Sequence, residues 1–155
     1  MISFKAGAKY VSVALLVAAL SGCGGDGGGR QGSVPLEDYT PEQIFERGEF
    51  ELARNRSKDA AFYFSEIERL YPYSEYAKQA MIMQAFANHK AKNYEESRSA
   101  AQRFIDFYPT DEDAAYAQYL LALSYYDQID EVGRDQGLTF QALQALLTVI
   151  EVYPD

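Results

Sequence analysis

The sequence contains no tryptophan, a single cysteine and few basic residues. Since one cysteine cannot form an internal disulfide, packing must stabilise the fold. The 155 residues include 14 lysines and arginines against 23 acidic residues, which gives a formal net charge of −9. An acidic surface repels nucleic-acid phosphates, and this argues against nucleic acid as a partner. Large side chains are nevertheless present, as 13 tyrosines and 9 phenylalanines.

Residues 1–22 have the features of a secretory signal peptide. Lys5 and Lys9 form a basic start, and the ten residues 11–20, VSVALLVAAL, form an apolar run. That run is too short to cross a bilayer and has the length of a signal-peptide core. We therefore expect residues 1–22 to be removed on export.

A short motif, Leu20, Ser21, Gly22 and Cys23, ends this segment. Small residues before a cleavage site fit a peptidase cleft, and the Cys23 thiol is the nucleophile that accepts lipid. The motif resembles the bacterial lipobox, which implies a diacylglycerol and an N-acyl chain on Cys23 as the covalent lipid. Gly24 at the sorting position then implies the outer membrane. An ordinary signal peptide with a chance cysteine is the alternative.

The predicted lipid-bearing cysteine is followed by a glycine-rich tether, and together they make up residues 23–39. Six of the ten residues at 24–33 are glycine, a composition typical of flexible coil. Thr40 and Pro41 then have the residue types of a helix N-cap and of the first helical position.

The dipeptide Tyr-Pro occurs three times, and each copy ends an amphipathic run. Because proline stops a helix, each run is predicted to be a helix that ends at the same point. An earlier helical pattern precedes each run, so the chain is predicted to contain three helix–turn–helix units. Their predicted bounds are 40–73, 74–110 and 111–155, with an inserted loop near 128–136 in the third unit.

These units resemble the tetratricopeptide repeat (TPR), a helical hairpin of 34 residues. Small residues recur where the paired helices must approach closely: Gly48, Ala85 and Ala122 in the first helices, and Ala60, Ser97 and Ala142 in the second. The expected fold is an all-α TPR solenoid with three repeats, the N-terminal part of a five-repeat protein. An ordinary helical bundle is the alternative. In the last helix, Leu143, Leu147 and Ile150 are expected near an uncovered edge.

The first helices of TPR units line a concave face, and four positions of each repeat point inward. The candidate peptide-binding groove predicted from these positions is rich in aromatic and aliphatic side chains and suits an extended peptide that carries aromatic residues. Packing of helix on helix is the alternative role for the same side chains. The groove residues are Phe45, Leu52, Ile82, Phe86, His89, Tyr119 and Tyr126, with Tyr116 and Leu123 at equivalent inward positions.

No catalytic motif is found in the sequence. His89 is the only histidine, and no motif supplies a partner nucleophile or acid. No metal-ligand cluster and no glycine-rich phosphate loop are present. We therefore expect a protein that is not an enzyme, has no metal and carries no cofactor other than its lipid.

Several segments together resemble the BamD family, the TPR lipoproteins of the outer-membrane β-barrel assembly (BAM) machinery. They are the lipobox, the pattern from Ala60 to Pro72, the run AAQRFIDFYPTD at 100–111, and Arg134-Asp135-Gln136 in the inserted loop. Asp135 is also expected to cap the helix that follows it.

The resemblance implies a subunit anchored by lipid in the inner leaflet of the outer membrane, on the periplasmic face. Its implied partners are the BamA periplasmic domains, other BAM lipoproteins and the C-terminal signals of unfolded outer-membrane β-barrel proteins. A TPR scaffold lipoprotein for pilus, cell-wall or division work is one alternative function. A periplasmic hydrolase whose catalytic domain lies beyond these residues is another.

Overall fold

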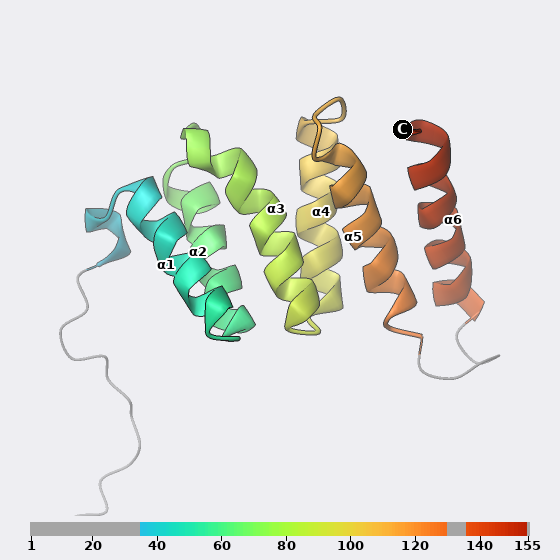
Figure 1. The fold of residues 1–155 in the computed structure, drawn as a ribbon, viewed down its shortest axis with the longest axis horizontal. Coiled ribbons are helices and arrows are strands. Elements are labelled where there is room, and N and C mark those ends of the chain that lie inside the picture. The colour runs from blue at the N-terminus through green and yellow to red at the C-terminus, as the bar shows by residue number, and fades with distance from the viewer. Residues whose placement is uncertain (1–34, 130–135, 155) are drawn as a thin grey trace, which may run out of the picture. The chain divides into compact units, whose positions relative to one another are not determined.

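The computed structural model describes residues 35–129 and 136–154 (Figure 1). In these ranges the chain is all-helical, as predicted, and contains no strand. The predicted signal peptide, the lipobox with Cys23, the tether up to residue 34, Asp135 and most of the inserted loop lie outside them. The elements are the short 3-10 helix η1 (Leu36–Asp38) and helices α1 (Pro41–Ala53), α2 (Ser57–Leu70), α3 (Glu75–Lys90), α4 (Tyr94–Phe107), α5 (Ala114–Tyr126) and α6 (Gln136–Val152).

The six α-helices form three consecutive hairpins, in which α1 packs on α2, α3 on α4 and α5 on α6. The hairpins stack because α2 also packs on α3, and α4 on α5. Each first helix touches the next first helix, whereas the second helices approach one another less closely. Helices α1, α3 and α5 therefore form one layer, drawn in front of α2 and α4 in Figure 1.

The first two hairpins repeat in backbone detail. Tyr71 and Tyr108 end the second helices with nearly identical angles, φ −134° and ψ 54° against φ −132° and ψ 55°. Asn55 and Lys92, in the turns between paired helices, both have positive φ values of 58° and 62°. Both pairs are 37 residues apart, as are Pro72 and Pro109. The spacing of the Tyr-Pro motifs thus matches a structural repeat.

Helix α1 begins with a reciprocal cap. The backbone N–H of Gln43 donates to Thr40 Oγ1 at 3.3 Å, and the Thr40 N–H donates to Gln43 Oε1 at 2.9 Å. Two of the free N–H groups at the helix start are satisfied in this way. The predicted roles of Thr40 as N-cap and Pro41 as first helical residue are confirmed.

Close approach of α1 and α2 depends on Gly48. A Cβ atom at this position would lie 2.6 Å from the ring of Phe64, which is fully buried. The first small position of the repeat therefore leaves room for a phenylalanine ring from the paired helix. The core of this hairpin is formed by Ile44, Phe45, Phe64 and Ile67.

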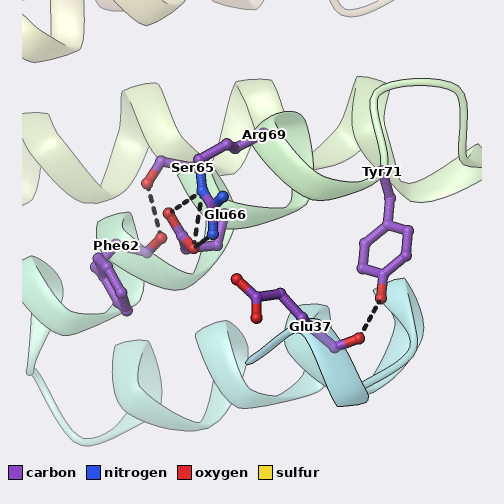
Figure 2. Close-up of polar contacts among 6 residues, drawn as sticks. All are labelled: Glu37, Phe62, Ser65, Glu66, Arg69 and Tyr71. Carbon is purple, nitrogen blue, oxygen red and sulfur yellow. Dashed lines mark hydrogen bonds and ion pairs between the residues drawn. The ribbon is translucent and has the colours of Figure 1, made fainter. Parts of the chain in front are cut away.

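Tyr71 connects the end of α2 to the segment that precedes α1. Its hydroxyl donates to the Tyr39 carbonyl oxygen at 2.7 Å. The same hydroxyl contacts the Glu37 carbonyl oxygen at 3.3 Å (Figure 2). Tyr153, in the third Tyr-Pro motif, makes a longer contact from its hydroxyl to the Pro109 carbonyl oxygen, at 3.5 Å. In the first and third hairpins, the tyrosine of the motif thus ties the end of the second helix to the segment before the first.

A buried chain of hydroxyl groups joins the second and third hairpins. The Ser124 hydroxyl donates to Ser97 Oγ at 2.9 Å, and the Ser97 hydroxyl donates to the Ala85 carbonyl oxygen at 2.9 Å. Both serines are fully buried. The chain links α5 to α4 and α4 to α3, so these small residues contribute hydrogen bonds as well as close packing.

We expect Ser97→Ala to lower the free energy of unfolding by about 1–2 kcal/mol, because the buried Ser124 hydroxyl loses its partner. Removing both hydroxyls in Ser97→Ala/Ser124→Ala should cost less than the sum of the two single changes. Urea unfolding of the four proteins measures this difference. Additive losses would contradict the coupling.

Candidate peptide-binding face

Two residues of the predicted groove lie in the core. Phe45 is 5% exposed, and its ring centroid lies 5.3 Å from that of Phe64 and 5.5 Å from that of Tyr76. Ile82 is 6% exposed and packs in the cluster that contains Phe104. Both point toward the following first helix, which covers them, so we remove Phe45 and Ile82 from the candidate groove.

The remaining groove residues differ in exposure. Leu52 and Phe86 are half-buried against the first and second core clusters. Tyr119 and Tyr126 are 43% and 59% exposed. Tyr119 lies 37 residues after Ile82 and occupies the equivalent place, but no described first helix follows α5 to cover it. Its exposure therefore reflects its position in the last described hairpin.

Two positions of each first helix stay open in all three hairpins. Residues seven apart on a helix share one face, so these positions form a continuous stripe across the first-helix layer. We call them the open stripe, and they are exposed or half-buried throughout. Its members are Glu42 and Glu49 on α1, Gln79 and Phe86 on α3, and Tyr116 and Leu123 on α5.

The open stripe changes in chemistry along the stack. It is acidic on α1, carries the amide of Gln79 and the ring of Phe86 on α3, and is aromatic and aliphatic on α5. Tyr116 is 40% exposed, and its partial burial, with Tyr119 nearby, raises the pKa of its hydroxyl above the ordinary value of 10.0. At neutral pH the ring is therefore an uncharged amphipathic surface, of the kind enriched in binding sites.

His89 links three helices. Its Nε2 atom is buried and lies 3.0 Å from Asp127 Oδ2 at the end of α5, without the geometry of a well-formed hydrogen bond. Its ring lies edge-on to Tyr94, with centroids 5.7 Å apart. With its side chain only 18% exposed, His89 packs between α3, α4 and the end of α5.

Two arginines that sequence reasoning missed brace α4 against its neighbours. Arg98 donates to the Ser124 carbonyl oxygen at 3.1 Å and lies 4.6 Å from the ring centroid of Tyr125. Arg103 donates twice to Glu68 on α2, at 3.0 and 2.9 Å. In the sequence, both residues stand where exposed arginines of a helix would stand. The pattern of apolar and polar residues along α4 therefore does not predict that they contact neighbouring helices.

An ion pair joins α3 to the loop before α5. Lys78 Nζ lies 2.8 Å from Asp111 Oδ2, and Asp111 Oδ1 accepts the Asp113 N–H at 3.1 Å. The hydrogen bond from Lys78 lowers the pKa of Asp111 below its ordinary value of 3.8. The hydrogen bond to Asp111 raises the pKa of Lys78 above its ordinary value of 10.5.

The two pKa shifts set the pH range over which this pair stabilises the fold. The contribution of Asp111 is present above pH 3.8 and lost as the pH falls through its lower folded-state pKa. The contribution of Lys78 is present below pH 10.5 and lost as the pH rises through its higher folded-state pKa.

We expect Lys78→Met to lower the melting temperature at pH 7, and the deficit to shrink once the pH falls below 3.8. Thermal melts of both proteins between pH 2 and 8 measure this difference. A deficit that stays constant at acid pH would show that the aliphatic part of the lysine side chain, rather than the ion pair, is responsible.

The described ranges contain no group of three or more His, Cys, Asp or Glu residues that could hold a metal ion. In the same ranges, no helix is both long enough and apolar enough to cross a membrane.

Helix α6 exposes apolar side chains. As expected, Leu143, Leu147 and Ile150 are uncovered, at 53%, 38% and 70% exposure.

Known proteins resemble this chain over most of its length. Residues 37–155 match the YfiO family, described as outer membrane lipoprotein. The outer membrane protein assembly factor BamD of Caulobacter vibrioides is 36% identical over 148 residues, covering 96% of this chain and 48% of that protein. BamD of Rickettsia prowazekii is 37% identical over 112 residues, covering 72% of this chain and 45% of that protein.

The chain therefore spans about half the length of these relatives. The family match covers the described helices and the region of the inserted loop. On the strength of both comparisons, the chain belongs to the YfiO/BamD family of outer membrane lipoproteins.

Proposed function

We propose that this chain is a non-enzymatic lipoprotein subunit of the outer-membrane β-barrel assembly complex and helps receive and insert unfolded β-barrel proteins. The observation that carries the proposal is its 36% identity to a protein named as an outer membrane protein assembly factor, over 96% of the chain. The stacked hairpins support it, because such stacks present extended surfaces for other proteins.

Affinity purification of the full-length lipoprotein from membranes tests this proposal. The BamA periplasmic domains and other BAM lipoproteins should be recovered with it, and depletion should lower the level of folded outer-membrane β-barrel proteins. Recovery without BamA, together with normal barrel proteins and a defect in pili, cell wall or division, would instead support a scaffold for another envelope process.

The anchor in this proposal is lipid on Cys23, which holds the helical body at the periplasmic face of the outer membrane. The lipobox motif and the family description as outer membrane lipoprotein support it. A single acyl chain holds a protein only marginally, and two or more hold it stably. Mass spectrometry of the mature N-terminus tests the proposal, since it should find diacylglycerol and an N-acyl chain on Cys23.

We further propose that the three hairpins are TPR units and that the relatives' extra length adds two more. The uncovered side chains of α5 and α6 support this extension, because the equivalent residues Phe45 and Ile82 are covered by the next first helix. A structure of the complete protein would test it. In that structure Tyr119 should be buried, while Tyr116 on the open stripe should stay exposed.

The open stripe is the proposed contact surface for the C-terminal signal of an unfolded barrel protein. Its apolar and aromatic end, formed by Phe86, Tyr116 and Leu123, supplies surface for aromatic side chains of the peptide. Its acidic end, formed by Glu42 and Glu49, favours peptides without negative charge there. This arrangement predicts that binding is directional along the stack.

We expect Tyr116→Ala to weaken binding of a C-terminal β-barrel peptide about tenfold, which is the size of a moderate interface contact. Fluorescence anisotropy of a labelled peptide measures the affinity. Tyr73→Ala is the matched control, because Tyr73 is 100% exposed in the loop before α3 and lies off the stripe. Equal affinities for the two variants would remove the stripe from the binding site.

A further inference from the structure

An unbroken series of cations and aromatic rings runs along the outer edge of the first hairpin. The guanidinium carbon of Arg47 lies 5.5 Å from the ring centroid of Phe50 and 5.8 Å from that of Tyr63. That of Arg54 lies 5.2 Å from Phe50, and the rings of Phe62 and Tyr63 are 5.6 Å apart. We call these five residues, from α1 and α2, the cation–aromatic edge.

The cation–aromatic edge is open to water in the described part of the chain. Phe50 is 49% exposed and Phe62 is 45% exposed. Helix α3 packs on the other side of this hairpin, where it covers Phe45. The two phenylalanine rings are joined through Arg47 and Tyr63, and connected exposed apolar groups mark contact surfaces more often than scattered ones do.

The charges of this region stand out in an acidic chain. Residues 54–58, RNRSK, contain three cations and no acid. Arg47 and Arg56 share the buried carboxylate of Glu51, at 3.5 and 3.4 Å. Within the described ranges, Arg54 and Lys58 have no carboxylate within 4.0 Å.

Three exposed acids flank the same edge, namely Glu46, Glu49 and Asp59. The edge is thus an amphipathic surface with locally free cations rather than a broad basic face. Aromatic rings that sit at the membrane–water interface, next to arginine and lysine side chains that reach phosphates, have this composition.

The tether limits how far the edge can be from a membrane. Pro35, the first described residue, lies twelve positions after Cys23. A chain of that length spans at most roughly 40 Å and has a mean end-to-end distance of about 20 Å if it is flexible. A lipid on Cys23 would therefore hold the first hairpin near the lipid headgroups, whatever path the tether takes.

We propose that the cation–aromatic edge rests on the anionic phospholipid headgroups of the membrane that holds the anchor. The inference rests on the proposed lipid at Cys23 and adds an orientation to it. Phe50 and Phe62 lie at the headgroup level, while Arg54 and Lys58 pair with phosphates. Contact through this edge fixes the orientation of the helical stack relative to the membrane.

The absence of tryptophan allows a direct test, because each substitution introduces the only indole in the chain. The lipidated full-length chain is placed on vesicles of phosphatidylethanolamine and phosphatidylglycerol with brominated acyl chains. Emission from Phe50→Trp and Phe62→Trp should shift to the blue and be quenched. Phe107→Trp is the control, because Phe107 is 67% exposed on α4, away from the edge. Equal quenching at all three positions would overturn the proposal.

The charge contribution is tested by Arg54→Ala/Lys58→Ala in the Phe50→Trp chain. Each cation near an anionic membrane contributes about 1 kcal/mol, so the docked fraction relative to the undocked one should fall roughly thirtyfold. Quenching that is unchanged by this double substitution would also overturn the proposal.

Vesicle flotation separates this inference from the anchor on which it depends. Chains that float but show no selective quenching would retain the anchor and refute the docking. Loss of flotation by the unsubstituted chain would refute both. Neither measurement depends on recovery of BamA, which tests the assembly function alone.

Discussion

Phe104→Ala is expected to lower the free energy of unfolding by about 3–5 kcal/mol, the usual cost of removing a fully buried aromatic ring. Phe104 is completely buried where α3, α4 and α5 meet, in contact with Met81, Ile82 and Ala114. Since each hairpin is stabilised by its neighbours, loss of this ring should weaken the stack at its centre. Urea unfolding followed by circular dichroism measures the change.

Phe107→Ala is the matched control for this prediction. The same residue type is removed from the same helix one turn later, but Phe107 is 67% exposed. Its loss should change the free energy of unfolding by no more than about 0.5 kcal/mol. Similar destabilisation by the two substitutions would mean that helix propensity, rather than burial at the hairpin junction, sets the cost.

Gly48→Leu should destabilise the first hairpin by about 3 kcal/mol, because the new side chain overlaps the ring of Phe64. A Cβ atom alone would already meet this ring at 2.6 Å. Phe64→Ala should cost about 3–5 kcal/mol through the cavity that it leaves. In Gly48→Leu/Phe64→Ala the leucine fills part of that cavity, so the double variant should be more stable than Phe64→Ala alone.

Gly137→Leu provides the matched glycine control. Gly137 lies in α6, and a Cβ atom there would meet nothing within 4 Å. This substitution should be neutral or slightly stabilising, since glycine is a poor helix former. If Gly48→Leu proved equally neutral, the stack would have moved its helices apart, and the double variant would then show no rescue.

Much of the fold could be predicted because local and long-range signals coincide. Each Tyr-Pro motif stops a helix, and small residues recur at the positions where helices must meet. The start of the last helix also follows from the sequence, because the helix is expected to follow Asp135, and α6 begins at the next residue, Gln136.

The candidate face was only partly predictable from the sequence. The repeat pattern identifies the helices that form the first-helix layer and the positions that point away from each hairpin's own core. It does not predict how each hairpin packs on the next. The packing of each hairpin on the next covers Phe45 and Ile82, whereas Tyr116 and Leu123 stay open. Arg98 and Arg103 add hydrogen bonds to other helices, and the pattern of a single helix does not reveal such partners.

The contact of Tyr71 with Tyr39 also determines how the protein responds to force. A pull transmitted through the residues before Pro35 loads η1 first and then the 2.7 Å hydrogen bond from the Tyr71 hydroxyl. Because each helix touches only nearby helices, the first hairpin can separate while Phe104 keeps its contacts with α3 and α5. Mechanical unfolding from the N-terminal side should therefore proceed in steps, and the hairpins farther along the stack would keep their part of the open stripe while the first one yields.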